Sequence, residues 1–104
     1  MARILVVDDQ PDALLAARAA LAAAGHETVL AADGERALEL LAGGGFDLLV
    51  IDPAVPLHDG WPVLATAGSL PVVVVSNDPA VTGRLPKPVV ASDLTAAVGA
   101  ALAG

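Results

Sequence analysis

Acidic residues directly follow two apolar runs of the chain, Asp8 and Asp9 after the first run and Asp52 after a later one. If both runs are parallel strands of one sheet, these carboxylates meet at the edge where the strands end. Carboxylates this close repel one another, so a positive charge must offset them. The candidates are a hard divalent cation such as Mg²⁺, which prefers oxygen ligands, and Lys87, the only lysine in the sequence.

This set of residues is suited to phosphoryl chemistry. A carboxylate held beside a bound cation and a lysine can attack a phosphoryl group, because both cations neutralise charge on the equatorial oxygens. Ser76 follows a Val-rich run and is expected at the same edge of the sheet. Taken singly, the residues leave plainer interpretations open, with Asp9 as a helix cap before Pro11 and Asp52 as a solvated strand end.

The spacing of apolar residues, Gly and Pro predicts the elements that would position these side chains. We expect strands over residues 3–7, 27–31, 47–52 and 71–75, with a weak fifth strand centred on Leu85. We expect helices over 13–24 (after Asp9 or Gln10 as cap and Pro11 in the first turn), 34–42, briefly 61–67, and from Ser92 or Asp93 to residue 103. Such an alternation predicts a mostly parallel sheet with helices on both faces.

Composition restricts the classes of protein to which this chain can belong. A length of 104 residues suits a single domain, 1–104, and with 56% hydrophobic but only 2% aromatic residues its core must be aliphatic. The net charge of −7 argues against direct binding to nucleic acid or to an anionic membrane, and favours cations and cationic partners. The absence of cysteine excludes disulfides and thiolate metal sites. No apolar run approaches the ~18 residues of a membrane span and no signal peptide is recognisable, so we expect a cytoplasmic protein.

Several short motifs, in order along nearly the whole chain, resemble the signature of bacterial response-regulator receiver domains. They are Ile4-Leu5-Val6-Val7-Asp8-Asp9, Asp52 followed by Pro56 and by Asp59-Gly60, Ser76 after the Val-rich run, and Lys87-Pro88. The stretch 28–41 is also similar to that family's second strand and helix. The resemblance implies an α/β fold, a flavodoxin-like, doubly wound parallel sheet of five strands in the order 2-1-3-4-5.

For the metal site, the resemblance implies Mg²⁺ or Mn²⁺ held by Asp8, Asp9, Asp52 and the backbone carbonyl of Ala54. Asp9 would be a direct ligand, whereas Asp8 would hold a metal-bound water.

For the chemistry, the resemblance implies that Asp52 is the phospho-acceptor, in a protein that catalyses only its own phosphorylation and dephosphorylation. Ser76 would form a hydrogen bond with one phosphoryl oxygen after transfer, and Lys87 would pair with another. The Lys87–Pro88 peptide bond would be cis. The phosphodonor would be a histidine kinase or a phosphotransfer protein, and the domain would regulate an output or partner in a two-component phosphorelay.

The sequence departs from the family between Ser76 and Lys87, which only residues 77–86 separate, whereas receiver domains place a full helix and its loops there. A parallel crossover usually needs about a dozen residues or more, and Pro79 and Gly83 are poor helix formers. We therefore expect the fourth helix to be absent or reduced to a turn. Its loss would uncover part of the Val-rich fourth strand, and exposed apolar patches usually mark interfaces. We hypothesise that a second copy, forming a homodimer, or an output partner covers this face.

A second departure is Arg84, which stands three residues before Lys87, where the family usually has an aromatic residue. An arginine cannot turn into an apolar slot as an aromatic ring can, because its charge would be buried unpaired. The alternatives are an ion pair with Asp78 or a contact with the phosphoryl group.

Two other functions compete with phosphoryl acceptance. A degenerate receiver domain would serve as a phosphorylation-independent dimerisation or interaction module; the short 77–86 segment and Arg84 favour it, whereas the complete set of carboxylates and Lys87 opposes it. Metal affinity separates these two functions, because a purely structural descendant has no reason to bind Mg²⁺. A phosphohydrolase of the haloacid-dehalogenase type needs a second aspartate two residues after the nucleophile, and Ala54 stands there.

Overall fold

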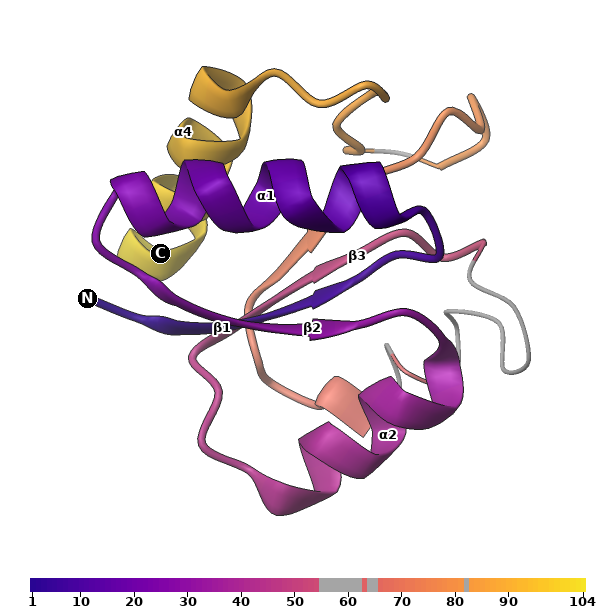
Figure 1. Cartoon of the computed structure of the whole chain (residues 1–104), viewed down its shortest axis with the longest axis vertical. Helices are drawn as coiled ribbons and strands as arrows, with labels where there is room; N and C mark the ends of the chain where they lie inside the picture. Colours follow the sequence, from indigo (N-terminus) through magenta and orange to yellow (C-terminus); the bar gives the residue numbers. More distant parts are fainter. Residues whose placement is uncertain (55–62, 64–65, 82) are drawn as a thin grey trace.

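The fold is a parallel sheet with helices on both faces, seen in a computed structural model that describes residues 1–54, 63, 66–81 and 83–104. Figure 1 shows α1 and α4 on one face of the sheet and α2 on the other. The strands are β1 (Arg3–Val7), β2 (Glu27–Ala31), β3 (Leu48–Ile51) and β4 (Val72–Val74), and the helices are α1 (Pro11–Ala23), α2 (Gly34–Gly43) and α4 (Ala91–Ala103). This is the doubly wound, flavodoxin-like arrangement that the sequence predicts.

The order of the strands is β2-β1-β3-β4, and all three pairings are parallel. This order agrees with the prediction, but the described sheet has four strands instead of five. At the fifth position, Leu85 forms a single parallel bridge with Val75, in which its N–H donates to the Val74 carbonyl at 2.8 Å and its carbonyl accepts from Ser76 at 2.9 Å. The next bond of this ladder would run from the Lys87 N–H to the Ser76 carbonyl, but the Lys87 N–H donates to Asn77 Oδ1 at 2.8 Å, so the pairing does not extend.

Two cores lie on opposite faces of the sheet because successive strand residues point to opposite sides. On the face of α1 and α4, side chains of the strands pack against Leu14, Leu21, Leu94 and Val98. On the face of α2, alternate strand residues pack against Ala37 and Val63. The central strands β1 and β3 are covered on both faces and carry continuous apolar runs, as buried parallel strands do.

Local sequence signals set the helix ends. Helix α1 begins with Pro11 after the N-cap Gln10, and Gly25, with φ 88°, follows its C-terminal end. At the start of α2, the Asp33 side chain accepts from the Arg36 N–H at 2.8 Å. Helix α4 begins at Ala91, earlier than the predicted Ser92 or Asp93, because the Val90 carbonyl already accepts from Leu94 N–H at 3.0 Å.

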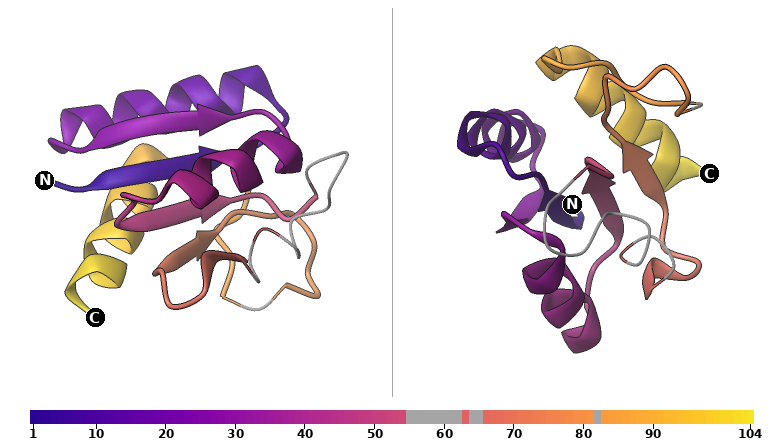
Figure 2. Two further views of the ribbon diagram at one scale, coloured as in Figure 1. Left: turned by 90° about the horizontal axis from the view of Figure 1, so that it is seen from below. Right: turned by 90° about the vertical axis from the view of Figure 1, so that its right-hand side faces the viewer.

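The segment between β4 and α4 contains no helix in residues 77–81 and 83–84, the part that the structure describes, as predicted. It forms turns held by side chains: Asp78 Oδ1 accepts from the Ala80 N–H at 2.9 Å, and Asn77 Oδ1 accepts from the Lys87 N–H at 2.8 Å. Figure 2 shows this segment as an open loop at the end of the sheet to which the strands point. Of the predicted helix 61–67, Val63, Thr66 and Ala67 are helical, and the other residues lie outside the described part.

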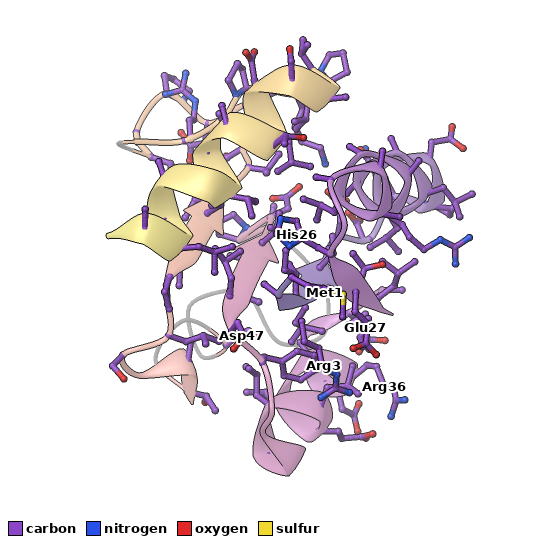
Figure 3. The ribbon with its side chains drawn as sticks, turned by 90° about the vertical axis from the view of Figure 1, so that its left-hand side faces the viewer. Met1, Arg3, His26, Glu27, Arg36 and Asp47 are labelled. Carbon is purple, nitrogen blue, oxygen red and sulfur yellow. The ribbon has the colours of Figure 1, made fainter. Side chains whose placement is uncertain are left out.

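The opposite end of the sheet is fastened by Arg3, which Figure 3 shows beside Glu27 and Asp47. The Arg3 N–H donates to Asp47 Oδ2 at 2.8 Å, and its guanidinium lies 4.5 Å from the Phe46 ring centroid and 3.9 Å from Glu27. These contacts join the beginnings of β1, β2 and β3. Asp8 and Asp52 lie at the other end of the sheet, where the strands end. Among the described helices, none combines the length and the apolar composition that crossing a membrane requires.

Candidate functional site

The ends of β1 and β3 bring Asp8, Asp9 and Asp52 together, with one carboxylate oxygen of each lying within 4.8 Å of the others. The register pairs Val7 with Ile51, so the residues that follow these two lie side by side. Backbone bonds continue past the strand ends, since the Asp52 N–H donates to the Val7 carbonyl at 2.9 Å. Asp8 and Asp52 are buried, whereas Asp9 is exposed. The cluster therefore has two buried carboxylates and one that faces solvent.

Lys87 joins the two buried carboxylates. Its ammonium donates to Asp8 Oδ2 and to Asp52 Oδ2, each at 2.9 Å, and only 12% of the side chain is exposed. Burial by itself would lower the pKa of Lys87, but the hydrogen bonds and charges of Asp8 and Asp52 outweigh it and raise this pKa above 10.5. Lys87 thus stays charged at neutral pH. The peptide bond from Lys87 to Pro88 is cis, as expected.

The charge of the cluster is not balanced by Lys87 alone. Three carboxylates and one ammonium leave two negative charges uncompensated. Backbone N–H groups hold the second oxygens of the buried acids: Gln10 donates to Asp8 Oδ1 and Ala54 donates to Asp52 Oδ1, each at 3.0 Å. A hard divalent cation has the charge that the cluster lacks, and carboxylate oxygens are its preferred ligands. The donor set therefore fits such an ion.

Two further predicted residues lie at the same end of the sheet. Ser76 is buried where β4 ends, and its Oγ accepts from the Asp78 N–H at 3.0 Å. Within the described residues, the Ser76 hydroxyl donates to no acceptor, so its proton is available to a ligand. Ala54 is exposed, and its N–H bond to Asp52 keeps it close to the carboxylate. The motif residues Pro56, Asp59 and Gly60 lie outside the described part of the chain.

A cavity of about 500 Å³ opens beside the carboxylates, and sequence reasoning missed it. Its polar end holds Asp8, Asp52 and Lys87, and its apolar wall comes from α1 and from the start of α4. The alanines of α1 that line it are Ala13, Ala16, Ala17 and Ala20. Their spacing repeats every three or four residues, which puts them on one helix face, and that signal was present in the sequence.

Comparison with known proteins identifies relatives of this chain. The response regulator receiver domain family matches residues 4–99. The response regulator MprA of Mycobacterium ulcerans is 35% identical over 115 positions, which cover 96% of this chain and 50% of MprA. The transcriptional regulatory protein TcrA of Mycobacterium tuberculosis is 36% identical over 87 residues, covering 80% of this chain and 34% of TcrA. This chain thus spans from a third to a half of the length of these relatives. Since the match to MprA is longer than the 104 residues of this chain, some of its positions have no counterpart here.

Solved structures show the same similarity. The receiver domain of the hybrid histidine kinase CckA is 40% identical, with a TM-score of 0.80 over 96% of this chain and 98% of that one. A response regulator from Chloroflexus aurantiacus is 26% identical, with a TM-score of 0.90 over 99% of this chain and 98% of that one. With the family match spanning most of the sequence and these structures sharing its fold, the chain belongs to the response regulator receiver domain family.

Proposed function

We propose that this receiver domain accepts a phosphoryl group on Asp52 and so acts as a phosphorylated signalling module in a two-component phosphorelay. The observation that carries this proposal is the position of Lys87, whose ammonium bridges Asp8 and Asp52 at 2.9 Å beside the exposed Asp9. An ammonium held against a carboxylate at the end of a strand neutralises charge that develops during phosphoryl transfer. The phosphodonor is a phosphohistidine of a histidine kinase or phosphotransfer protein.

In this reaction a carboxylate oxygen of Asp52 attacks phosphorus, the bond from phosphorus to the donor's imidazole nitrogen breaks, and its electron pair stays on the imidazole. The Ala54 N–H holds Asp52 Oδ1, which orients the carboxylate. Lys87 stays charged and pairs with an oxygen of the transferred group. The Ser76 hydroxyl oxygen accepts from the Asp78 N–H, and its proton is donated to a second phosphoryl oxygen. Hydrolysis of the acyl phosphate then restores Asp52.

Mg²⁺ is the cofactor that we propose for the carboxylate cluster. Asp8, Asp9, Asp52 and the Ala54 carbonyl would hold it, with Asp8 acting through a bound water. When bound, the ion would neutralise charge on the phosphoryl oxygens. The two uncompensated negative charges of the cluster and its all-oxygen ligands support this assignment.

Replacing Asp9 by asparagine is expected to weaken Mg²⁺ binding at least about tenfold, because the variant loses the exposed charge of the cluster. Titration calorimetry with MgCl₂ measures this affinity. The matched control is Asp12→Asn, which removes an exposed carboxylate from the first turn of α1 and should leave the affinity nearly unchanged. Equal affinities of the wild type and Asp9→Asn would remove Asp9 from the metal site.

The proposed function is tested by titrating the protein with beryllofluoride in the presence of Mg²⁺, which mimics an aspartyl phosphate. We expect saturable binding that requires Mg²⁺ and shifts the amide resonances of residues around Asp52. If neither Mg²⁺ nor beryllofluoride binds, the chain is the alternative, a phosphorylation-independent interaction module. The absence of a helix in the described part of 77–84 is the observation that favours this second function.

We also propose that a second copy of the chain covers β4. Val72 and Val74 are only half-buried, and the described chain joins the outer side of β4 through a single bridge, Val75 to Leu85. An open strand edge of this kind pairs readily with another strand.

Light scattering during size exclusion is expected to show a dimer at high protein concentration. The variant Val72→Lys should be monomeric, because a lysine on an edge strand opposes pairing. A wild type that stays monomeric at the highest concentration, with and without beryllofluoride, would contradict self-association.

A further inference from the structure

The register of the sheet places Arg84 beside β4, which separates it from β3 and Asp52. Because Val75 pairs with Leu85, the preceding residues Val74 and Arg84 are level with each other, and Val74 pairs with Ile51. Leu85 packs into the core on the face of α1 and α4, so strand alternation places Arg84 on the opposite face. Val74 packs on that face too, and Ser76 follows it two residues later.

The guanidinium of Arg84 is incompletely bonded. Its Nη1 donates to the Val81 carbonyl at 3.2 Å, whereas its Nε is buried without a partner. Among the described side chains, this Nε is the one buried nitrogen or oxygen for which no partner exists. A buried donor that belongs to a charged group and lacks an acceptor is costly, and an anion bound at this nitrogen would remove the cost.

Among the described residues, no carboxylate forms an ion pair with Arg84. The ion pair with Asp78 that the sequence left open does not form, since Asp78 Oδ1 accepts from the Ala80 N–H instead. The ion pairs between described residues involve Arg3, Arg36 and Lys87, but not Arg84. An arginine with an open donor and no counter-charge is suited to bind an incoming anion.

We propose that Arg84 binds the phosphoryl group on Asp52, with the guanidinium nitrogen Nε as donor. This inference rests on the proposed function and adds a residue to it. Neighbouring strands lie roughly 4.8 Å apart, so Arg84 starts about two strand spacings from Asp52, within the combined reach of an arginine and a phosphorylated aspartate. Phosphorylation adds negative charge at Asp52. Lys87 already pairs with both Asp8 and Asp52, so a further positive group is needed to balance the added charge.

The hydrogen bond from Arg84 to the Val81 carbonyl would connect phosphoryl binding to the surface loop 77–81. While Nη1 holds the Val81 carbonyl, a bond from the same guanidinium to the phosphoryl group links the loop 77–81 to Asp52. The loop stands where the sequence lacks a helix, so Arg84 transmits the phosphorylated state to the face next to β4.

The experiment compares beryllofluoride affinity, Mg²⁺ affinity and thermal stability in the wild type, Arg84→Met and Arg18→Met. Arg18 is exposed on α1, so its variant controls for the loss of one positive charge. In Arg84→Met we expect beryllofluoride to bind about tenfold more weakly in the presence of Mg²⁺. The affinity for Mg²⁺ alone should not change, and the ligand-free protein should be as stable as the wild type or more stable, because an unpartnered buried donor is gone. Arg18→Met should match the wild type in all three measurements.

Three results would overturn the inference. If Arg84→Met binds beryllofluoride like the wild type, Arg84 does not meet the phosphoryl group, and the proposed function stands without it. If Mg²⁺ affinity falls together with beryllofluoride affinity, Arg84 has a structural role. If the wild type binds no beryllofluoride, both the proposed function and this inference fail. Should Arg84→Met not fold, Arg84→Gln decides in its place by the same criteria.

Discussion

Replacing Asp52 by asparagine is expected to reduce phosphoryl uptake at least about a thousandfold, because the amide oxygen is a poor nucleophile. The fold should survive, since asparagine can still accept from the Ala54 N–H that now holds Asp52 Oδ1. Incubation with Mg²⁺ and radiolabelled acetyl phosphate, followed by counting of the protein, measures the uptake.

The control for this variant is Asp12→Asn, which removes an exposed carboxylate near the cavity and should take up label like the wild type. Label that persists in Asp52→Asn would mean that another carboxylate of the cluster accepts the phosphoryl group. Asp8 and Asp9 are then the residues to exchange next, since a carboxylate oxygen of each lies within 4.8 Å of one of Asp52.

Replacing Lys87 by methionine is expected to have two large effects. Phosphoryl uptake should fall about a hundredfold or more, because the ammonium that faces the reacting carboxylate is gone. The metal-free protein should also lose about 3 kcal/mol of unfolding free energy, since Asp8 and Asp52 stay buried without their partner. Mg²⁺ should restore more stability to this variant than to the wild type, because it supplies the missing positive charge. Urea denaturation with and without Mg²⁺ measures both quantities.

The contribution of Lys87 to stability should depend on pH in a defined direction. Because the pKa of Lys87 is raised in the fold, its stabilising contribution is fully present below the ordinary value of 10.5 and is lost as the pH rises through the raised value. The difference in unfolding free energy between the wild type and Lys87→Met should therefore stay constant from neutral pH to about 10 and shrink above it. A difference that disappears below pH 9 would contradict the double ion pair.

Sequence patterns predict where the carboxylates and Lys87 lie in the fold. An apolar run that ends in acids predicts a buried strand with carboxylates at its end, and β1 and β2 have the predicted bounds. Parallel strands end at one edge of the sheet, and the direct pairing of β1 with β3 then brings Asp8 and Asp52 together there. Lys87 is the only lysine in the sequence that could offset the charge of these carboxylates, and its ammonium contacts both.

Other features depend on distances that no pattern in the sequence fixes. The fifth strand ends at one bridge, because its length depends on how the loop 77–81 places Leu85 against Val75. The cavity depends on the spacing between α1 and α4, as well as on the alanines that line it. The unpartnered Nε of Arg84 depends on which carbonyl the loop offers to the guanidinium, and that carbonyl is the one of Val81.

The most direct test of phosphoryl acceptance is the intact mass of the protein after incubation with acetyl phosphate. With Mg²⁺ present, the wild type should gain the mass of one phosphoryl group and lose it again on standing, as an acyl phosphate hydrolyses. Without Mg²⁺, or in Asp52→Asn, the mass should not change. A wild type that binds Mg²⁺ but gains no mass from acetyl phosphate or from any phosphohistidine donor would contradict the proposal that Asp52 accepts a phosphoryl group.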